Sequence, residues 1–407
     1  MGRPDVKLLF VSADGNHNKF YNMHDEGNGS FTAHWGRVGA DGTYTPYDIS
    51  KWDATYNSKI KKGYKDVTGN TAQICEYAPV SDAELNKLLN AFLENSRQYV
   101  SHFTASTAIS DTAAAEAQRH INEMAKNIDV PNPDNTTLNA FNAHLLKLFE
   151  IIPRKISRVQ DALCTTLSER PSHVAKEQSL LDNLINMTKN APKSSGTQTI
   201  EDAFGFSITK CTQAEIDFIK DKLQKDGFYR YTFNRAWKIN NPNREKGFEE
   251  YLENNHLKNN DKNVKMYWHG TGTENILSIM ANGLLIKPSN ASYSGSMYGL
   301  GIYNAPNADK AAGYTSIAGS YWKGGSSNVA YMFINAVIMG KQYDVKDNYE
   351  TYNGITIRNL DNDKFSSADL GYHSVYAHAG GYLKRDEAIV YNQNQVACRY
   401  LVEFKTR

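Results

Sequence analysis

The stretch YWHGT at residues 267–271 marks a predicted corner between a strand and a helix. Alternating apolar residues over 264–268 predict the strand, and helical apolar spacing over 273–283, ending at a glycine suited to a left-handed cap, predicts the helix. The corner holds His269 and Gly270, so a side chain and backbone amides can face a ligand there. The alternative is a core histidine beside a tight turn, and the stretch alone does not separate the two interpretations.

Length and composition limit the classes of protein to which this chain can belong. Its 407 residues suffice for two or three domains, and 40% of them are hydrophobic, enough for real cores. The formal net charge is only +1, so any contact with nucleic acid must be local. The cysteines lie far apart and form no C-x-x-C pair, which argues against a zinc finger or a disulfide framework. We therefore expect a reducing interior and no metal.

The chain shows no sign of membrane targeting. The N-terminus carries no apolar signal segment, and no apolar run approaches about 18 residues, the length that a spanning helix requires. Val6 stands where a myristoylation site has Ser or Thr. We expect an intracellular protein with no membrane partner, nuclear if its source is a eukaryote and in the cytoplasm or nucleoid if it is a bacterium.

Three composition regimes follow one another along the chain. Residues 1–78 are rich in Gly, Tyr, Trp and Asn and alternate over short stretches, which predicts a small β-rich domain with one helix near 49–64. Residues 79–190 have helical apolar spacing and predict an all-α bundle. A linker with Pro, Ser and Gly at 191–199 leads to residues 197–407, where helix and strand patterns mix. The expected fold class is multidomain α+β, with antiparallel-type sheets in the C-terminal domain.

Individual helices and strands are also predicted. Ser81 and Glu84 have the spacing of a capping box before an apolar helical run. Further helical runs cover 112–128, 138–149, 154–167 and 174–190. The strongly apolar residues 330–339 predict a buried strand, and apolar residues at alternate positions over 398–404 predict a half-buried one.

Four motifs in the C-terminal half occur in a specific order. Trp268-His269-Gly270 comes first, MYGLGIY at 297–303 follows, Lys310 and Tyr314 come next, and DEAIVY at 386–391 is last. In order and in neighbouring residues they resemble the His-Tyr-Glu signature of the poly(ADP-ribose) polymerase catalytic domain. The resemblance implies cleavage of the nicotinamide–ribose bond of NAD⁺ and transfer of ADP-ribose, with NAD⁺ as substrate and no metal.

The resemblance also assigns roles in NAD⁺ binding. Gly270 would pair its backbone with the nicotinamide carboxamide, which a glycine allows to approach closely. Thr271, where the family usually has Ser, keeps a hydroxyl donor for the same amide. His269 would bind the ribose on the adenosine side. Tyr303 and Tyr314 would stack on the nicotinamide ring from its two faces.

Glu387 and Lys310 complete the implied pocket. Glu387 would bond the 2′-hydroxyl of the nicotinamide ribose and polarise the acceptor, so that Glu387, His269 and Tyr303 form the catalytic set. Lys310 matches a lysine that lines this pocket in the family. Members that keep the glutamate can extend ADP-ribose chains, and those with an apolar residue there generally stop at one unit, so Glu387 favours polymer formation.

Each assignment has a plainer alternative, and two positions depart from the family pattern. Tyr is abundant, with 25 residues, so a single Tyr is more often part of a core or a surface, and an isolated Glu is more often a solvated charge. Leu285 stands where the family often has Arg before the donor loop, which puts an Arg contact to adenosine in doubt. Asn304 replaces the aromatic residue that commonly follows the signature Tyr.

The N-terminal residues HWGRVG at 34–39 resemble the core of a WGR domain, a resemblance that covers about 70 residues and implies binding to DNA ends. Trp35 can stack on a terminal base or sugar, and Arg37 can fork onto a phosphate. Lys59 and Lys62 belong to a local cluster that can neutralise phosphates. The alternative for Trp35 is a buried anchor of a small β domain.

The predicted bundle resembles the regulatory helical domain of DNA-dependent members, most closely at Leu181-Asp182-Asn183-Leu184. In relatives the acidic residue lies beside the NAD⁺ pocket, which would make Asp182 a regulatory residue in a switch between order and disorder. The alternative is a plain polar position on a packed helix.

Together these features predict a poly(ADP-ribose) polymerase stimulated by DNA strand breaks, in particular by breaks with a 5′-phosphate. Its acceptors would be proteins, including itself, and growing ADP-ribose chains. Two alternatives remain open: a mono-ADP-ribosyltransferase acting on protein or DNA ends, and a DNA-bound scaffold that binds NAD⁺ without turnover.

Overall fold

The computed structural model describes residues 2–70, 76–191, 194, 196–286, 297–318, 328–367, 371–381 and 383–406. Contacts divide the chain into two compact units. The N-terminal unit holds residues 1–75 and 97–191, and the C-terminal unit holds 76–96 and 192–407. Both units mix helices and strands, as expected for a multidomain α+β protein. Among the described residues, no helix combines the length and apolar character needed to cross a bilayer.

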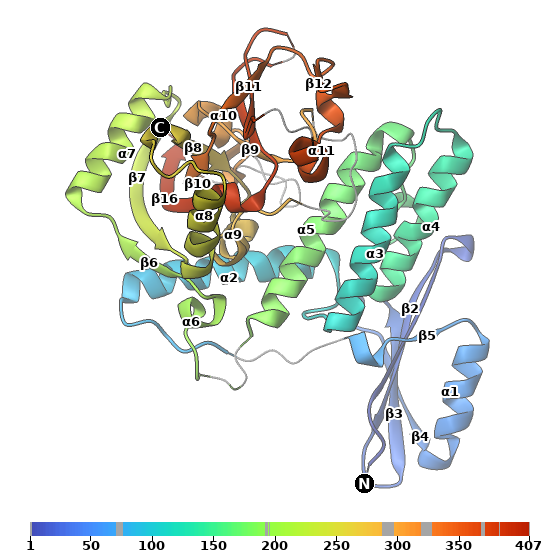
Figure 1. The fold of residues 1–407 in the computed structure, drawn as a ribbon. Helices are drawn as coiled ribbons and strands as arrows, with labels where there is room; N and C mark the ends of the chain where they lie inside the picture. The colour runs from blue at the N-terminus through green and yellow to red at the C-terminus, as the bar shows by residue number, and fades with distance from the viewer. Residues whose placement is uncertain are drawn as a thin grey trace. The chain divides into compact units, whose positions relative to one another are not determined.

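A five-stranded antiparallel sheet forms the first part of the N-terminal unit (Figure 1). Its order is β4-β3-β2-β1-β5, and its strands are β1 (Val6–Ser12), β2 (His17–Asp25), β3 (Ser30–Arg37), β4 (Thr43–Asp48) and β5 (Lys65–Asp66). Helix α1 (Trp52–Lys61) packs on one face through the buried ring of Trp52, which contacts Phe31 edge to face. Phe31, Ala33 and Leu8 are buried in this small core because alternate strand residues point to the same face.

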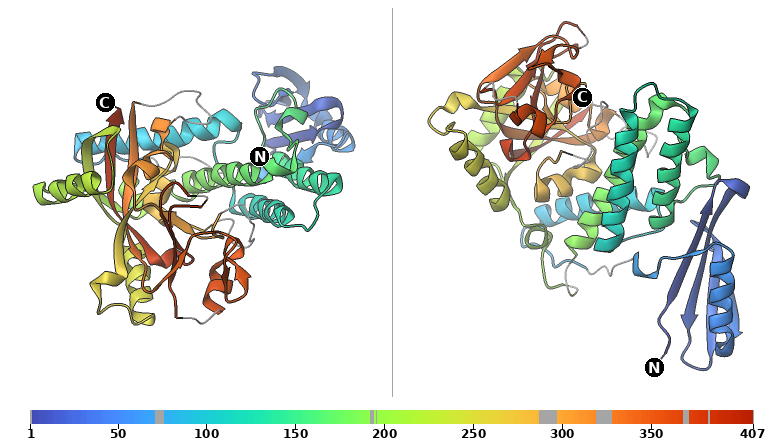
Figure 2. Two further views of the ribbon diagram at one scale, coloured as in Figure 1. Left: turned by 90° about the horizontal axis from the view of Figure 1, so that it is seen from above. Right: turned by 45° about the vertical axis from the view of Figure 1, so that its right-hand side comes forward.

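Three helices lie side by side in the rest of the N-terminal unit (Figure 1, Figure 2). They are α3 (Asp111–Ile128), α4 (Asn135–Ile151) and α5 (Arg170–Lys189). Ser110 caps α3, and Asp134 with Thr137 forms a capping box before α4, so both starts follow from local sequence. The predicted runs 112–128, 138–149 and 174–190 fall on these helices, apart from one residue at the end of α5.

The predicted helix over 154–167 is wrong. This segment contains only short 3₁₀ turns at Gln160–Ala162 and Leu167–Glu169. Its carbonyl oxygens accept hydrogen bonds from side chains elsewhere in the unit, including Asn18 to the carbonyls of residues 154 and 156, at 2.8 and 3.5 Å. These bonds attach the segment to β2, a tertiary contact that local apolar spacing does not encode.

Helix α2 (Ala83–Phe103) contributes to both units, with residues 83–96 in the C-terminal unit and 97–103 in the N-terminal unit. Within the C-terminal unit, its apolar face is part of the main core, together with strand and helix residues such as Phe333 and Leu277. The α2 members of this core are Leu88, Leu89, Phe92 and Leu93. Residues 83–96 are therefore an integral part of the C-terminal unit.

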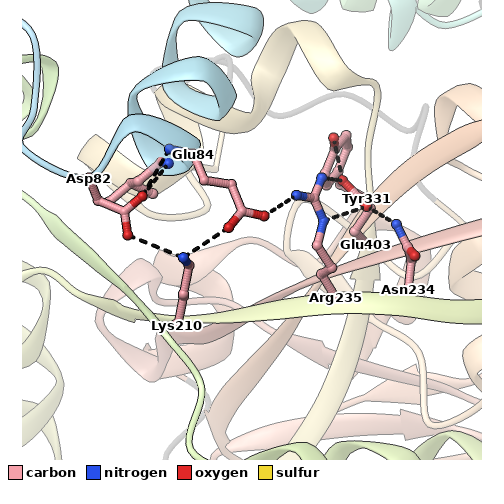
Figure 3. A network of polar contacts seen from close by, with 8 residues as sticks. Asp82, Glu84, Lys210, Asn234, Arg235, Tyr331 and Glu403 are labelled. Atoms are coloured by element: carbon pink, nitrogen blue, oxygen red, sulfur yellow. Dashed lines mark hydrogen bonds and ion pairs between the residues drawn. The ribbon is translucent and has the colours of Figure 1, made fainter.

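The start of α2 corrects the capping box predicted from Ser81 and Glu84. Asp82 is the capping residue, since its Oδ1 accepts from the backbone amides of Glu84 at 2.9 Å and Leu85 at 3.1 Å. Glu84 instead reaches out to cations on strands: its carboxylate lies 2.8 Å from Lys210 Nζ and 2.6 Å from Arg235 Nη1 (Figure 3). Sequence spacing could not reveal these partners because they lie more than a hundred positions away.

The C-terminal unit is built on two sheets. The larger has the order β6-β7-β16-β10-β8 and is antiparallel throughout. Its strands are β6 (Ser207–Lys210), β7 (Tyr231–Asn240), β8 (Val264–Gly270), β10 (Val329–Ile338) and β16 (Val396–Thr406). The smaller has the order β11-β14-β15-β9, with a parallel β11–β14 pair and antiparallel pairs otherwise. Its strands are β9 (Ile302–Asn304), β11 (Gln342–Val345), β14 (Ser374–Ala377) and β15 (Glu387–Val390).

Short elements surround these sheets. The helices are α6 (Ile200–Phe204), α7 (Gln213–Lys225), α8 (Pro242–Asn254), α9 (Ile276–Asn282), α10 (Ala308–Ala312) and α11 (Asn362–Ser367), and a small hairpin pairs β12 (Thr351–Tyr352) with β13 (Ile355–Thr356). The predicted helix after the YWHGT corner is α9, preceded by a 3₁₀ turn at Thr273–Asn275. Gly283 ends α9 with φ 71° and ψ −173°, a positive φ that lies outside the left-handed helical region predicted for it.

Candidate active site

A cavity of about 660 Å³ opens in the C-terminal unit where β8, β9, α10 and β15 meet. The motif residues that line it are His269, Gly270, Tyr303, Lys310, Tyr314 and Glu387. Thr271 is not part of the wall, and its hydroxyl accepts a 3.1 Å hydrogen bond from Asn275 Nδ2. The fold therefore brings together residues that lie more than a hundred positions apart in sequence.

His269 is held in one orientation at the end of β8. Its Nδ1 lies 3.0 Å from the carbonyl oxygen of Tyr303, which can only accept, so Nδ1 carries the proton. Burial lowers the pKa of His269, outweighing the opposing effect of that hydrogen bond. The ring is therefore neutral at pH 7, and Nε2 is left as an acceptor for a hydroxyl group.

Gly270 sits where no side chain fits. A Cβ atom built on it would lie 1.7 Å from the carbonyl oxygen of Ala311 at the end of α10. The strand and this short helix therefore approach each other closely only because residue 270 is a glycine. Trp268, two residues earlier on the same face of β8, is fully buried and donates from Nε1 to Asp226 Oδ2 at 2.7 Å, which fixes this end of the strand.

Two tyrosines border the cavity in different ways. The hydroxyl of Tyr303 donates to the carbonyl of Gly299 and accepts from the amide of Tyr298, both at 2.8 Å, so its ring is fixed. Tyr314 follows α10 and is 65% exposed, so its ring stands at the mouth. Partial burial and the charge of Glu387 raise the pKa of Tyr314.

Glu387 and Lys310 form an ion pair in the wall of the cavity. Lys310 Nζ lies 2.7 Å from Glu387 Oε1, and both side chains are nearly buried. The same ammonium donates to the carbonyls of Arg385 at 3.0 Å and Asp386 at 3.3 Å. Lys310 therefore binds both the carboxylate of Glu387 and the backbone just before it, which holds this carboxylate in place.

The cavity also has a cationic rim that the motif comparison did not predict. Lys384 and Arg385 line it from the segment before β15, and both are exposed. Arg230 also lines it and pairs with Asp309 at 3.3 Å. In the sequence, the only sign of this rim was the adjacent pair Lys384 and Arg385 directly before Asp386.

The departures from the family pattern have different outcomes in the structure. Asn304 is buried, and its Oδ1 accepts from Asn335 Nδ2 at 3.0 Å, so an amide pair joins β9 to β10 where an aromatic ring was expected. Leu285 is only partly buried. The donor loop beyond it, at 287–296, lies outside the described residues.

The residues predicted to bind DNA lie on the N-terminal sheet. Trp35 is 42% exposed, so it is not the buried anchor of the alternative interpretation, and its Nε1 donates to Thr45 Oγ1 at 3.2 Å. Tyr44 pairs with His34 across β3 and β4, on the other face of the sheet from Trp35; it is 68% exposed and stacks on His34 with 4.1 Å between ring centroids. The sheet thus presents exposed aromatic rings, which can stack on bases.

The basic residues near this sheet differ in their availability. Arg37 already donates within the N-terminal unit, to Asn16 and to the carbonyls of residues 156 and 157. Lys59 Nζ lies 3.7 Å from the centroid of the Tyr21 ring, and burial lowers its pKa. Lys62 is exposed. Arg37 therefore joins the sheet to the segment between α4 and α5.

Asp182 lies on α5, half-buried inside the N-terminal unit. Its Oδ1 accepts a 2.9 Å bond from Gln178, whose amide exchanges two bonds with Gln118 of α3, at 2.7 and 2.8 Å. The carboxylate is thus part of a polar network between two helices of the bundle.

Two regions of the chain match known protein families. Residues 213–406 match the poly(ADP-ribose) polymerase catalytic domain, and residues 5–71 match the WGR domain. The putative poly [ADP-ribose] polymerase-like 100L of invertebrate iridescent virus 6 is 30% identical over 192 residues, 46% of this chain and 92% of that protein. The human protein mono-ADP-ribosyltransferase PARP3 is 31% identical over 146 residues, 36% of this chain and 22% of that protein.

The geometry of the cavity agrees with these matches. The matched catalytic segment contains the whole cavity wall, and the matched WGR segment contains the sheet with exposed aromatic rings. The chain therefore belongs to the poly(ADP-ribose) polymerase family and combines a WGR domain with an ADP-ribosyltransferase domain that uses NAD⁺.

Proposed function

We propose that this protein is a DNA-break-stimulated poly(ADP-ribose) polymerase that modifies proteins, including itself, and extends the attached chains. The observation that carries this proposal is the ion pair of Glu387 with Lys310 in the wall that also contains His269 and Gly270. A carboxylate fixed in this way can accept a proton from an incoming hydroxyl group, which chain extension requires.

The proposed binding mode uses the fixed groups of the wall. The carboxamide of NAD⁺ would pair with the backbone of Gly270, where the absent side chain leaves the main chain accessible. The nicotinamide ring would lie between Tyr303, whose hydroxyl is anchored, and the exposed Tyr314. A ribose hydroxyl would donate to Nε2 of His269. Thr271 lies outside the wall, so its proposed contact requires a small adjustment on binding.

The reaction would break the C–N bond between nicotinamide and ribose and form a C–O bond to the acceptor. Nicotinamide leaves with the bonding electrons, and positive charge develops on the ribose carbon. Glu387 would hold the 2′-hydroxyl of that ribose, stabilise the charge and accept the proton of the acceptor. Lys310 would keep the carboxylate aligned between successive transfers.

A mono-ADP-ribosyltransferase is the second candidate, because human PARP3, which carries that name, is among the relatives. Both candidates consume NAD⁺ and release nicotinamide, whereas a binding scaffold would do neither. Product length on a denaturing gel with labelled NAD⁺ separates them. Ladders of increasing length support the polymerase, single additions support the transferase, and absence of nicotinamide release supports the scaffold.

DNA stimulation would begin at the exposed ring of Trp35, with Lys59, on the same face of the sheet, and Lys62 neutralising phosphates, including a 5′-phosphate. Arg37 connects that sheet to residues 156 and 157 of the helical part. DNA bound on the sheet would therefore loosen the bundle through this contact. If the bundle restrains NAD⁺ binding, the loosening raises NAD⁺ turnover.

Asp182 would take part in that restraint. Its removal should raise NAD⁺ turnover without DNA, and should leave turnover with saturating DNA unchanged, because DNA already relieves the restraint. Asp182→Ala is compared with Asp129→Ala, a change just beyond α3. Equal DNA-free rates in the parent and in Asp182→Ala would leave Asp182 with a purely structural role. Blunt, nicked and 5′-phosphorylated DNA are tested in parallel to identify the effective break.

A further inference from the structure

A cysteine, a glutamate and a histidine converge beside the start of α5, away from the cavity residues described above. Cys164 is buried in the segment between α4 and α5, Glu169 immediately precedes α5 and is exposed, and His173 lies in its first turn and is half-buried. Their ligand atoms all lie within 4.8 Å of one another. We propose that Cys164, Glu169 and His173 bind a divalent transition metal ion, and that Zn²⁺ fits this ligand set best.

The separation of the three groups is close to what coordination requires. Zinc binds sulfur at about 2.3 Å and nitrogen or oxygen at about 2.0–2.2 Å, so neighbouring ligands of a tetrahedral site lie about 3.5 Å apart. Closing the cluster therefore needs movements of about 1 Å, which side-chain rotation of the exposed Glu169 can largely supply. Among the residues that the structure describes, this is the one group of three His, Cys, Asp or Glu side chains gathered so closely.

Cys164 is positioned by a double hydrogen bond of its backbone to α4. Asn142 accepts from the Cys164 amide and donates to its carbonyl, both at 2.9 Å. The thiol donates to the carbonyl of Thr166 at 3.1 Å. A metal would displace this thiol proton to solvent and form a bond to the thiolate, while the backbone of Cys164 stays fixed.

Glu169 and His173 each keep one ligand atom available. Oε2 of Glu169 accepts from the amide and hydroxyl of Thr165 and from the amide of Thr166, at 2.8–3.2 Å, which orients the carboxylate. Among the described residues, Oε1 has no hydrogen-bond partner. The His173 ring stands edge-on to Phe141 of α4, which positions its imidazole beside Cys164 and Glu169.

The types of ligand in this set of residues determine which ion it should bind. One thiolate, one carboxylate and one neutral imidazole balance the charge of a divalent ion, and the sulfur and nitrogen ligands disfavour Mg²⁺ and Ca²⁺. The exposed Glu169 leaves a route for entry and room for a water as fourth ligand. No metal was predicted from the sequence because the cysteines form no C-x-x-C pair, whereas this set has the spacing C-x₄-E-x₃-H.

A bound ion would tie the segment before α5 to α5 itself, the helix that carries Asp182. Binding to the folded state alone would stabilise this end of the bundle, because an unfolded chain does not hold the three ligands together. The inference does not depend on the proposed catalytic function, since none of the three residues lines the cavity.

Cobalt titration of the full-length protein tests the site. The protein is stripped of metal with a chelator, and Co²⁺ is added while the absorption spectrum is recorded. We expect one equivalent to produce a thiolate-to-cobalt charge-transfer band with visible bands of a tetrahedral ion, and Zn²⁺ to abolish both. Cys164→Ser should remove the charge-transfer band, and His173→Gln should weaken Co²⁺ binding at least about 10- to 100-fold, the range seen even for outer-shell partners. Cys211→Ser, in the C-terminal unit, is the matched control and should behave as the parent.

Several results would overturn the proposal. They are absence of the bands in the parent protein, binding well below one equivalent, or a charge-transfer band that persists in Cys164→Ser and disappears in Cys211→Ser. Circular dichroism checks that each variant is folded. Should Cys164→Ser fail to fold, thermal unfolding of His173→Gln decides: Zn²⁺ should raise the melting temperature of the parent and not of this variant, and an equal rise in both would refute the site.

Discussion

The guanidinium of Arg235 holds the carboxylate of Glu403 with two hydrogen bonds, 3.0 Å from Nε to Oε1 and 2.8 Å from Nη2 to Oε2 (Figure 3). Tyr331 and Asn234 also donate to this carboxylate, whose side chain is only 2% exposed. Arg235 in turn donates from Nη1 to Glu84 at the start of α2. One arginine thus joins a nearly buried acid of the sheet to an exposed acid of the helix.

This arrangement predicts unequal effects of two substitutions. Arg235→Ala leaves Glu403 buried without its cation and should cost about 3 kcal/mol of unfolding free energy, the low end for a broken buried pair because Tyr331 and Asn234 remain. Glu84→Ala removes only exposed pairs and should cost much less than Arg235→Ala. Urea denaturation measures both. Equal losses would show that Glu403 does not depend on Arg235.

Glu387→Gln should abolish chain extension while NAD⁺ binding stays within about tenfold of the parent. An amide has the shape of the carboxylate but cannot accept a proton, and general base catalysis contributes about 10²- to 10⁴-fold in rate. Gel analysis of product length and a binding titration with NAD⁺ provide the two readouts. Because the substitution also leaves Lys310 without its anion, Lys310→Met with Glu387→Gln serves as a control for stability. Long polymers from Glu387→Gln would contradict the assignment.

Substitutions of Trp35 and Arg37 should separate DNA binding from DNA response. Loss of a stacking ring costs about 1–3 kcal/mol per base, so Trp35→Ala should weaken DNA binding about tenfold to 100-fold. Arg37→Ala should weaken it less, since the guanidinium already bonds within the protein. It should instead reduce NAD⁺ turnover at saturating DNA and speed hydrogen exchange over residues 154–159.

Fluorescence anisotropy with a 5′-phosphorylated duplex measures the affinity of each variant for DNA, and nicotinamide release measures the response. The sequence alone suggested Arg37 as a phosphate ligand. That role would be supported, and the coupling role refuted, if Arg37→Ala lost affinity as strongly as Trp35→Ala and kept full turnover at saturating DNA.

Acid should destabilise the N-terminal unit through the pair His120 and His144. Their Nδ1 atoms lie 3.0 Å apart, and burial lowers the pKa of both rings. The charge of Arg119 lowers the pKa of His120 further, whereas the charge of Glu123 partly opposes the pKa shift of His144. A folded-state pKa below the unfolded value of about 6.5 means that the unfolded chain binds more protons. The free energy of unfolding of the N-terminal unit therefore keeps its full value above about pH 6.5 and declines as the pH falls below it.

Thermal unfolding at pH 7.5, 6.5 and 5.5, values chosen around the ordinary histidine pKa of about 6.5, tests this prediction. His144→Gln should flatten the decline, because only one buried ring then has to be charged. His256→Gln, an exposed histidine in the C-terminal unit, is the control. A pH profile of His144→Gln as steep as that of the parent would show that acid acts elsewhere.

Local patterns predicted much of the secondary structure. The apolar runs at 112–128 and 138–149 fall within α3 and α4, because a buried face imposes its period on the sequence. The strand predicted over 398–404 falls within β16, but it is not half-buried, since residues 401–404 are all buried. The predicted helix over 154–167 does not exist, and bonds from Asn18 and Arg37 to carbonyls of this segment attach it to the sheet instead. Partners so distant in sequence leave no local signal.

The candidate site was predictable only in part. Motif order identified the residues around His269, but not that Lys310 binds Glu387 or that Lys384 and Arg385 border the cavity. Those positions depend on how β9, α10 and β15 come together, which periodicity does not specify. The set of Cys164, Glu169 and His173 was missed for a related reason, since its ligands approach one another only once the chain turns into α5.

Because α2 is divided between the two units, the C-terminal unit alone cannot be produced from a single continuous stretch of the chain. The C-terminal unit is assembled from two separate stretches, 76–96 and 192–407, and its core contains Leu89 and Phe92 from the first. Residue 196 also bonds back to Glu76, and Thr199 pairs with Ala78. A fragment that begins near residue 196 should therefore aggregate alone and become soluble when a synthetic peptide of residues 76–96 is added. The transferase would then be a two-chain enzyme held together by fragment complementation, with its activity titrating to one peptide per fragment.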